Sequence, residues 1–265
     1  MRSLLLLLCL ATSLPGQSAT AHLTLPTRAE LDSISSRGIA LYEYDRAAWV
    51  ASDALMEQRP EPRSAQYYLV VRTEHDWNVC FGRLTDAEDT LYIVYSAREA
   101  VGDSVFSVTK LPTPVANTGD ELHAARALVT ARKAFGPTSR PYNHSVIPTG
   151  DGDWWVYLYP AQTVTNFWPL GGDERFRMSA DGTRIIDRHR MHVTVLETPT
   201  GANADSAGRI PQSYYHSAIV DNRPEDTDVL AVLSRSPRLP EYIPVKPGFV
   251  YRIDINGHIT LPMKL

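Results

Sequence analysis

The sequence predicts an α+β protein made of two units, each a helix followed by an antiparallel meander of strands, with a β-rich C-terminal extension. Three observations predict this class. Two amphipathic helical segments each begin at a Thr-x-x-Glu pattern, about ten short runs alternate apolar and polar residues, and the spacing from helix to strand repeats along the chain. Tyrosine, with 13 residues against 6 phenylalanines, favours half-exposed sheet faces.

The N-terminal segment 1–21 has the pattern of a secretory signal peptide. Arg2 precedes an apolar run over residues 4–10, and Ala19-Thr20-Ala21 precedes His22. The run is shorter than the roughly 20 apolar residues that span a bilayer, and no similar run follows. We therefore expect cleavage after Ala21, export to the periplasm or the medium, and no transmembrane segment in the mature chain.

Composition excludes several classes of protein. The formal net charge is −4 and no basic stripe offsets it, so nucleic acid is not expected as a partner. Cys80 is the one cysteine beyond the predicted signal peptide, which leaves no intramolecular disulfide. No phosphate-binding loop appears either, and the sequence predicts no cofactor.

The first predicted unit covers residues 22–114. Thr27 and Glu30 form a capping box, and the helix that they start ends before Arg59-Pro60. Alternating runs then predict the strands 66–72, 77–83, 91–96 and 105–110.

The second predicted unit covers residues 115–265. Thr118 and Glu121 repeat the capping-box pattern and predict a helix over 119–135, which Gly136-Pro137 ends. The predicted strands are 142–147, 154–159, 174–179 and 183–196, the last two joined by a turn at Asp181-Gly182. An Asp-Trp-x-Val strand follows each helix by about 18 or 19 residues, at 76–79 and again at 153–156, which suggests an internal duplication.

The C-terminal part departs from this repeat. Strands are predicted at 214–220 and 229–235, and a last hairpin turns at Asn256-Gly257. The acidic segment 221–228 lacks the order of a calcium loop and is interpreted as a solvated turn.

The succession of one helix and a curling meander, in units of under 100 residues, resembles the cystatin-like and PepSY-like exported modules. Asp-Gly-Thr-Arg at 181–184 resembles the hairpin turn late in PepSY units. The resemblance implies tandem modules over residues 27–197, and it carries no function, because the inhibitory glutamine-valine loop of the cystatins is missing.

Aromatic residues of the second unit are candidate binding residues. The loop 166–170 is an apolar insertion where the first unit has polar residues, so Phe167 and Trp168 either plug the sheet or contact a partner. Along the strand at 154–159, alternate residues Trp155, Tyr157 and Tyr159 share the face away from the helix, and this face is either covered or a binding surface.

Histidines and carboxylates supply a candidate metal site. Asp187, His189 and His192 lie within six residues and His216 follows in a later strand; such side chains bind zinc or copper. Strand alternation places Asp187 and His189 on one face and His192 on the other, so His192 can join them only at a bulge or through pairing with another strand. No H-E-x-x-H, paired C-x-x-C or G-x-S-x-G motif accompanies them.

Two functions follow as hypotheses. The first is an exported, non-enzymatic module that binds a protein, a peptide or an apolar small molecule through Trp155, Tyr157, Tyr159, Phe167 and Trp168. The alternative is an exported metal-assisted hydrolase that uses Asp187, His189, His192 and His216. Convergence of the histidines in space would favour the alternative.

Overall fold

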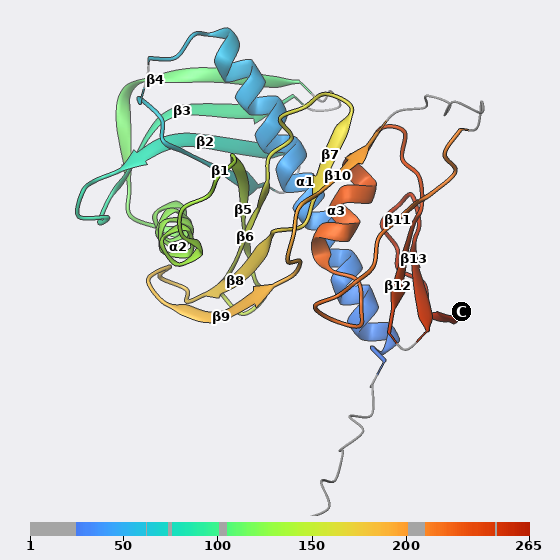
Figure 1. Cartoon of the computed structure of the whole chain (residues 1–265). Helices are drawn as coiled ribbons and strands as arrows, with labels where there is room; N and C mark the ends of the chain where they lie inside the picture. The colour runs from blue at the N-terminus through green and yellow to red at the C-terminus, as the bar shows by residue number, and fades with distance from the viewer. Residues whose placement is uncertain (1–24, 62, 74–75, 101–104, 201–209, 247) are drawn as a thin grey trace, which may run out of the picture.

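The computed structural model of this chain describes residues 25–61, 63–73, 76–100, 105–200, 210–246 and 248–265. The predicted signal peptide lies outside the described residues. The predicted α+β class is confirmed: three helices pack against several sheets, and the C-terminal part is rich in strands (Figure 1). The cystatin-like and PepSY-like pattern and the internal duplication stay predictions.

The two predicted meanders are present. The first sheet has the strand order β1-β2-β3-β4 and the second the order β5-β6-β8-β9, and every pair in them is antiparallel. The bounds are β1 (Tyr67–Arg72), β2 (Trp77–Leu84), β3 (Leu91–Glu99), β4 (Phe106–Asn117), β5 (Tyr142–Pro148), β6 (Trp154–Pro160), β8 (Glu174–Met178) and β9 (Ile185–Arg190). The expected single strand over 183–196 is wrong, because the chain leaves β9 at Arg190 and forms a new strand, β10 (Leu196–Pro199), against β7 (Phe167–Leu170).

The first helix, α1 (Arg28–Glu57), begins as predicted. The Glu30 backbone N–H donates to Thr27 Oγ1 at 3.3 Å, and the Thr27 backbone N–H donates to Glu30 Oε2 at 2.7 Å. The capping box predicted for the second helix, α2 (Asp120–Phe135), is wrong. Gly119 is its N-cap and no side chain caps it, because Glu121 instead accepts a hydrogen bond from Asn117 at 2.9 Å.

The two helices pack on opposite sides of the sheets. One apolar cluster joins α2 to the inner faces of both sheets, through residues such as Leu69 and Phe176. The other faces contact α1, which runs past both sheets (Figure 1). Strands β1 and β5 meet where the Tyr68 ring stacks on the His144 ring, with centroids 4.0 Å apart. Each helix therefore stabilises both meanders.

The C-terminal part adds a third sheet and a third helix. The sheet order is β11-β12-β13-β14, with β11 (Tyr214–Tyr215) parallel to β12 (Glu241–Val245), and β13 (Phe249–Ile253) and β14 (Met263–Lys264) antiparallel. A helix, α3 (Asp226–Ser234), connects β11 to β12 and lies beside α1 (Figure 1). The predicted strand at 229–235 is therefore wrong. Its apolar residues are buried on all sides between α1 and the sheets, a setting in which a helix is hydrophobic all round.

Two close backbone approaches fix α3 and the segment after β9. A Cβ on Gly38 of α1 would lie 2.4 Å from Val229 Cβ, so the two helices touch at a glycine. Gly171 has φ +97°, and a Cβ there would lie 2.3 Å from the Thr194 carbonyl oxygen and 3.1 Å from His192 Cβ. Glycine at 171 thus lets the chain around His192 lie directly on the end of β7. Among the described residues, no helix combines the length and the apolar character needed to cross a membrane.

Candidate metal centre

The segment interpreted as a solvated turn, 221–228, is the structural centre of the C-terminal half. Glu225, Asp226, Thr227 and Asp228 are all buried, and they form the start of α3. The Asp228 backbone N–H donates to the Glu225 carbonyl at 3.1 Å, and the Glu225 backbone N–H donates to Asp228 Oδ2 at 2.7 Å. Acidic residues suit this position because the free N–H groups of a helix start favour negative charge. The expectation of a solvated turn is therefore wrong for residues 225–228, whereas residues 221–223 form bends and are partly exposed.

Two histidines meet at Asp228. His192 lies two residues beyond β9, and its position is fixed by the Met191 backbone N–H, which donates to the Asp173 carbonyl at 3.1 Å. His216 follows β11 directly, and its backbone N–H donates to the Tyr242 carbonyl at 3.3 Å. The Nε2 atoms of His192 and His216 lie 3.1 and 3.2 Å from Asp228 Oδ1.

A carboxylate holds the far nitrogen of each ring. His192 Nδ1 lies 2.8 Å from Asp173 Oδ1, and His216 Nδ1 lies 2.7 Å from Glu241 Oε1. Arg235, which is 2% exposed, donates from Nη1 to the second oxygen of Glu241 at 2.5 Å. These contacts fix the far side of each ring and leave both Nε2 atoms close to the same oxygen of Asp228.

Burial and charge act against each other in this cluster. Burial lowers the pKa of His216, but Asp228 and Glu241 outweigh it and raise that pKa to about 9. Burial likewise opposes the charged form of His192, and Asp173 and Asp228 raise its pKa well above the usual value. Burial works to raise the pKa of Asp228, whereas His216 and His192 lower it well below the usual range.

The other predicted metal ligands lie elsewhere. Asp187 is exposed on β9. His189 Nε2 lies 3.0 Å from Glu225 Oε1 and 3.8 Å from Asp221 Oδ2, in a half-buried group apart from His192. The hydrogen bond to Glu225 raises the pKa of His189 despite its partial burial. The structure therefore brings together His192 and His216, adds Asp228, and places Asp187 and His189 outside the centre.

The predicted aromatic face is divided. Tyr157 is fully buried and donates from its hydroxyl to Asp226 Oδ2 at 2.9 Å, so it offers no binding surface. Trp155 is stacked by the Arg175 guanidinium, 4.8 Å from the ring centroid. Tyr159 and Trp168 both line a pocket of about 430 Å³, called the larger pocket below. Phe167 lies at the start of β7 and is 38% exposed.

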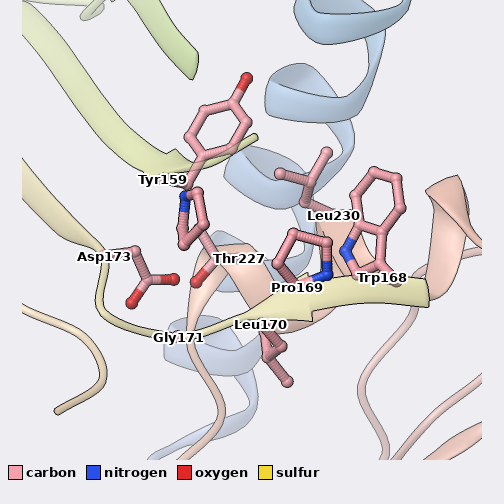
Figure 2. Close-up of a pocket in the computed structure, with 9 residues that line it drawn as sticks. Tyr159, Trp168, Pro169, Leu170, Gly171, Asp173, Thr227 and Leu230 are labelled. Carbon is pink, nitrogen blue, oxygen red and sulfur yellow. The ribbon is translucent and has the colours of Figure 1, made fainter. Parts of the chain in front are cut away.

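A small cavity lies between this pocket and the centre. Its volume is about 10 Å³, the space of one water molecule. Figure 2 shows Asp173 and Thr227 at one side of it and Trp168 at the other, with Tyr159 above. The second oxygen of Asp173 is buried and has no hydrogen-bond partner among the described residues.

Sequence reasoning missed Asp173, Asp228, Glu241 and Arg235. One signal for Asp228 was available: Glu-Asp-Thr-Asp before an apolar run is typical of a helix start. The others come from three separate loops and strand ends, and no local pattern links them. Comparisons with protein-family models, with curated proteins and with solved structures find no match for this chain.

Proposed function

We propose that this chain is an exported metal-dependent protein that binds one divalent transition metal ion, zinc by preference, through His192, His216 and Asp228. One observation carries the proposal: two imidazole Nε2 atoms and one carboxylate oxygen converge within 4.8 Å of one another in the protein interior. Imidazole nitrogen and carboxylate oxygen are ordinary ligands of zinc.

The distances support this set of ligands. With Zn–N and Zn–O bonds of roughly 2.0–2.2 Å, two ligand atoms of a tetrahedral site lie about 3.3 Å apart. The two measured separations between histidine Nε2 and Asp228 Oδ1 are 3.1 and 3.2 Å. Two of the three separations therefore suit a shared ion, and the third, between the two histidine nitrogens, is no more than 4.8 Å.

The orientation of the groups points the same way. His216 Nε2 and Asp228 Oδ1 are buried and have no hydrogen-bond partner among the described residues, although they lie 3.2 Å apart. Close atoms that are not aligned for a hydrogen bond, yet are excluded from water, are costly unless a third group satisfies both. A cation between them is such a group.

The surrounding carboxylates complete the arrangement expected around metal-binding histidines. A ligand histidine usually donates its second ring N–H to a carboxylate or carbonyl, which fixes the tautomer and the ring orientation. Asp173 and Glu241 occupy these positions at 2.8 and 2.7 Å. In the group of His189, Glu225 and Asp221, both carboxylates contact His189 Nε2, and among the described residues none contacts its Nδ1. These contacts are those of an ordinary ion pair.

The charges of the centre match a divalent ion. Asp173, Asp228 and Glu241 are three carboxylates and Arg235 is one cation, so the centre carries −2 when both histidines are neutral. A divalent ion neutralises it, and two protons on the histidines do the same without metal. The competing interpretation is therefore a buried network of ion pairs with both rings protonated.

Three protein ligands favour a reactive rather than a structural ion. Structural zinc sites have four protein ligands, whereas sites that activate water have three and keep one position open. An ion held by this set would lower the pKa of a bound water and polarise a carbonyl or phosphoryl group. This revises the hydrolase hypothesis: His192 and His216 stay, Asp228 joins them, and Asp187 and His189 are removed from the site.

Metal analysis tests the proposal. Protein purified without chelators should contain about one zinc per chain, and His216→Ala and Asp228→Asn should lose most of it. His189→Ala and Asp187→Asn are matched controls from the excluded positions and should retain the ion. Folding of each variant is checked by circular dichroism, and equal metal content in all four variants would refute the assignment.

Cobalt substitution tests the open position. The cobalt-loaded protein should show the intense visible absorption of a four-coordinate ion, and azide should shift it by displacing water. A spectrum that azide leaves unchanged would assign a closed, structural ion instead of a reactive one.

Proton release separates the metal centre from the network of ion pairs. Binding of a divalent ion must displace the protons that Asp173, Asp228 and Glu241 hold on the two histidines. Calorimetric titration with zinc near pH 7, in buffers of different ionisation enthalpy, should report release of about two protons. No heat of binding in any buffer would favour the network.

Export is tested separately. If residues 1–21 are a signal peptide, protein recovered from outside the cytoplasm should begin at His22. The intact mass of that protein is the measurement, and a chain that retains Met1 would contradict cleavage.

A further inference from the structure

The larger pocket, which lies apart from the metal centre, is built from aromatic side chains around one carboxylate. Its volume is about 430 Å³, within the range of small-molecule sites. Five aromatic side chains and one acidic residue are the relevant part of its lining: Tyr42, Trp49, Tyr68, Tyr159, Trp168 and Asp45. These residues come from α1, β1, β6 and β7, so the pocket forms only when these elements are assembled.

The carboxylate of Asp45 accepts a hydrogen bond but forms no ion pair with a described residue. Tyr159 donates its hydroxyl to Asp45 Oδ1 at 2.6 Å, and Ser145 Oγ lies 2.9 Å from the same hydroxyl. No described Lys, Arg or His forms an ion pair with Asp45. Arg46 also lines the pocket, but it pairs with Glu99 at 2.8 Å and not with Asp45.

The burial of Asp45 makes a cationic partner favourable. Burial raises the pKa of Asp45, only partly opposed by the hydrogen bond from Tyr159. A carboxylate in a poorly solvated position gains more from a nearby cation than an exposed one does. A positively charged group in the pocket would therefore restore the ionised form of Asp45.

The aromatic rings select the kind of cation. Tyrosine and tryptophan rings attract ammonium groups through their negative faces, and cages of such rings recognise alkylated ammonium ligands. Trp49 is 65% exposed and lines the pocket, so its ring is accessible to a ligand. Tyr159, 4% exposed, lies at the inner end, where it contacts Asp45.

We propose that this pocket binds a small organic monocation with an alkylated ammonium group, held by Asp45 and enclosed by the rings of Trp49, Tyr68, Tyr159 and Trp168. This site shares no ligand residue with the metal centre, so either assignment stands without the other. The sequence predicted an apolar ligand at Tyr159 and Trp168; the proposal specifies that this ligand also carries a positive charge.

Choline and its uncharged isostere 3,3-dimethyl-1-butanol are the probes. The two differ in charge and hardly in shape, so calorimetric titration of each into the full chain isolates the contribution of the cation. Choline should bind at least about tenfold more tightly than the alcohol. Equal affinities, or no binding of choline, would overturn the proposal.

Variants locate the binding. Asp45→Asn should weaken choline binding at least about tenfold, while Asp53→Asn, on the exposed face of the same helix, should leave it unchanged. Trp49→Leu is a second test on an exposed residue and should weaken binding without affecting folding. Wild-type affinity in both Asp45→Asn and Trp49→Leu would place choline elsewhere and refute the site.

Discussion

The start of α3 shows how neighbouring residues of similar type take different roles. Glu225 contacts His189, Asp226 contacts Arg37 and Arg175, and Asp228 contacts His192 and His216. A helical turn directs consecutive side chains in different directions, so each carboxylate reaches a different element. Three acidic residues that look alike in the sequence thus join α3 to β9, to α1 and to the candidate centre.

His144 should remain neutral in the folded protein at mildly acidic pH. Burial, and then the Arg132 charge, lower its pKa to about 3, and its Nε2–H donates to the Tyr68 carbonyl at 3.1 Å. Its NMR signals should not titrate between pH 7 and about pH 4, whereas those of His189, whose pKa is raised, should titrate with a midpoint above that of an ordinary histidine.

The same residue predicts a loss of stability in acid. Below about pH 6.5 the unfolded chain binds a proton at His144 and the folded chain does not. The free energy of unfolding is therefore unaffected by this residue above that pH, and it falls as the pH drops from about 6.5 towards 3. His144→Asn should flatten this part of the pH dependence, measured by urea unfolding. An unchanged slope would contradict the assignment.

At the scale of elements, the same sequence pattern gives a side-chain cap at the start of one helix and none at the start of another. Thr27 caps α1 with its side chain, whereas Thr118 stands before α2 without capping it. Both sites have the same Thr-x-x-Glu pattern. Asn117 makes the difference, because its side chain binds Glu121 and the Gly119 N–H.

Alanine at the two threonines should therefore have different effects. Thr27→Ala should lower the free energy of unfolding by about 1 kcal/mol, because it removes a side-chain cap. Thr118→Ala should leave it nearly unchanged, and it is the matched control. Urea melts of both variants decide the matter, and equal losses would mean that both threonines are caps.

The contact of α1 with α3 should not tolerate a methyl group. Gly38→Ala places a Cβ within 2.7 Å of the Asp226 carbonyl oxygen, so the helices must separate, at a cost of roughly 1–3 kcal/mol. Gly150→Ala, where no atom lies within 4 Å, should cost little. Thermal melts of both variants give the comparison, and a Gly38→Ala protein as stable as the wild type would show that the helices adjust freely.

Sequence patterns correctly predicted the elements that are determined by residues close together in the chain. The capping box at Thr27, the meanders and the turn at Asp181-Gly182 each depend on residues close in sequence. Helix α3 was missed because Val229 to Leu233 is a short apolar run, which by itself fits a buried strand or a buried helix. The acidic residues before it were the available sign of a helix start, and burial on all sides explains why the run is apolar throughout. His192 and His216 were predicted as ligands by residue type, but Asp228 could be joined to them only through the fold.

At the scale of the whole molecule, α1 belongs to several apolar clusters at once. Leu31 and Ile34 pack with the C-terminal sheet, Leu41 packs against β6 and α3, and Ala51 and Leu55 pack on the first sheet. A helix of 30 residues thus connects all the sheets that surround the two candidate sites. The parts of the fold are expected to unfold together.

A cavity in the middle of α1 should test this coupling. Leu41→Ala, at a fully buried position, should cost roughly 2–5 kcal/mol and raise amide hydrogen exchange in both β2 and β13. Met56→Ala, 66% exposed on the same helix, is the control and should do neither. Faster exchange confined to one sheet would contradict a shared unfolding unit.

The packing of the first helix against the last strands also governs the order in which a growing chain can fold. Arg28 donates to the Ile259 carbonyl at 3.1 Å, and the Ile259 N–H donates to Ser35 Oγ at 3.1 Å. The ribosome adds 224 residues after Ser35 before Ile259 exists. Leu31 and Ile34 therefore lack their packing partners in β12 and β13 while the chain is being made. Folding can be completed only after these strands have been synthesised.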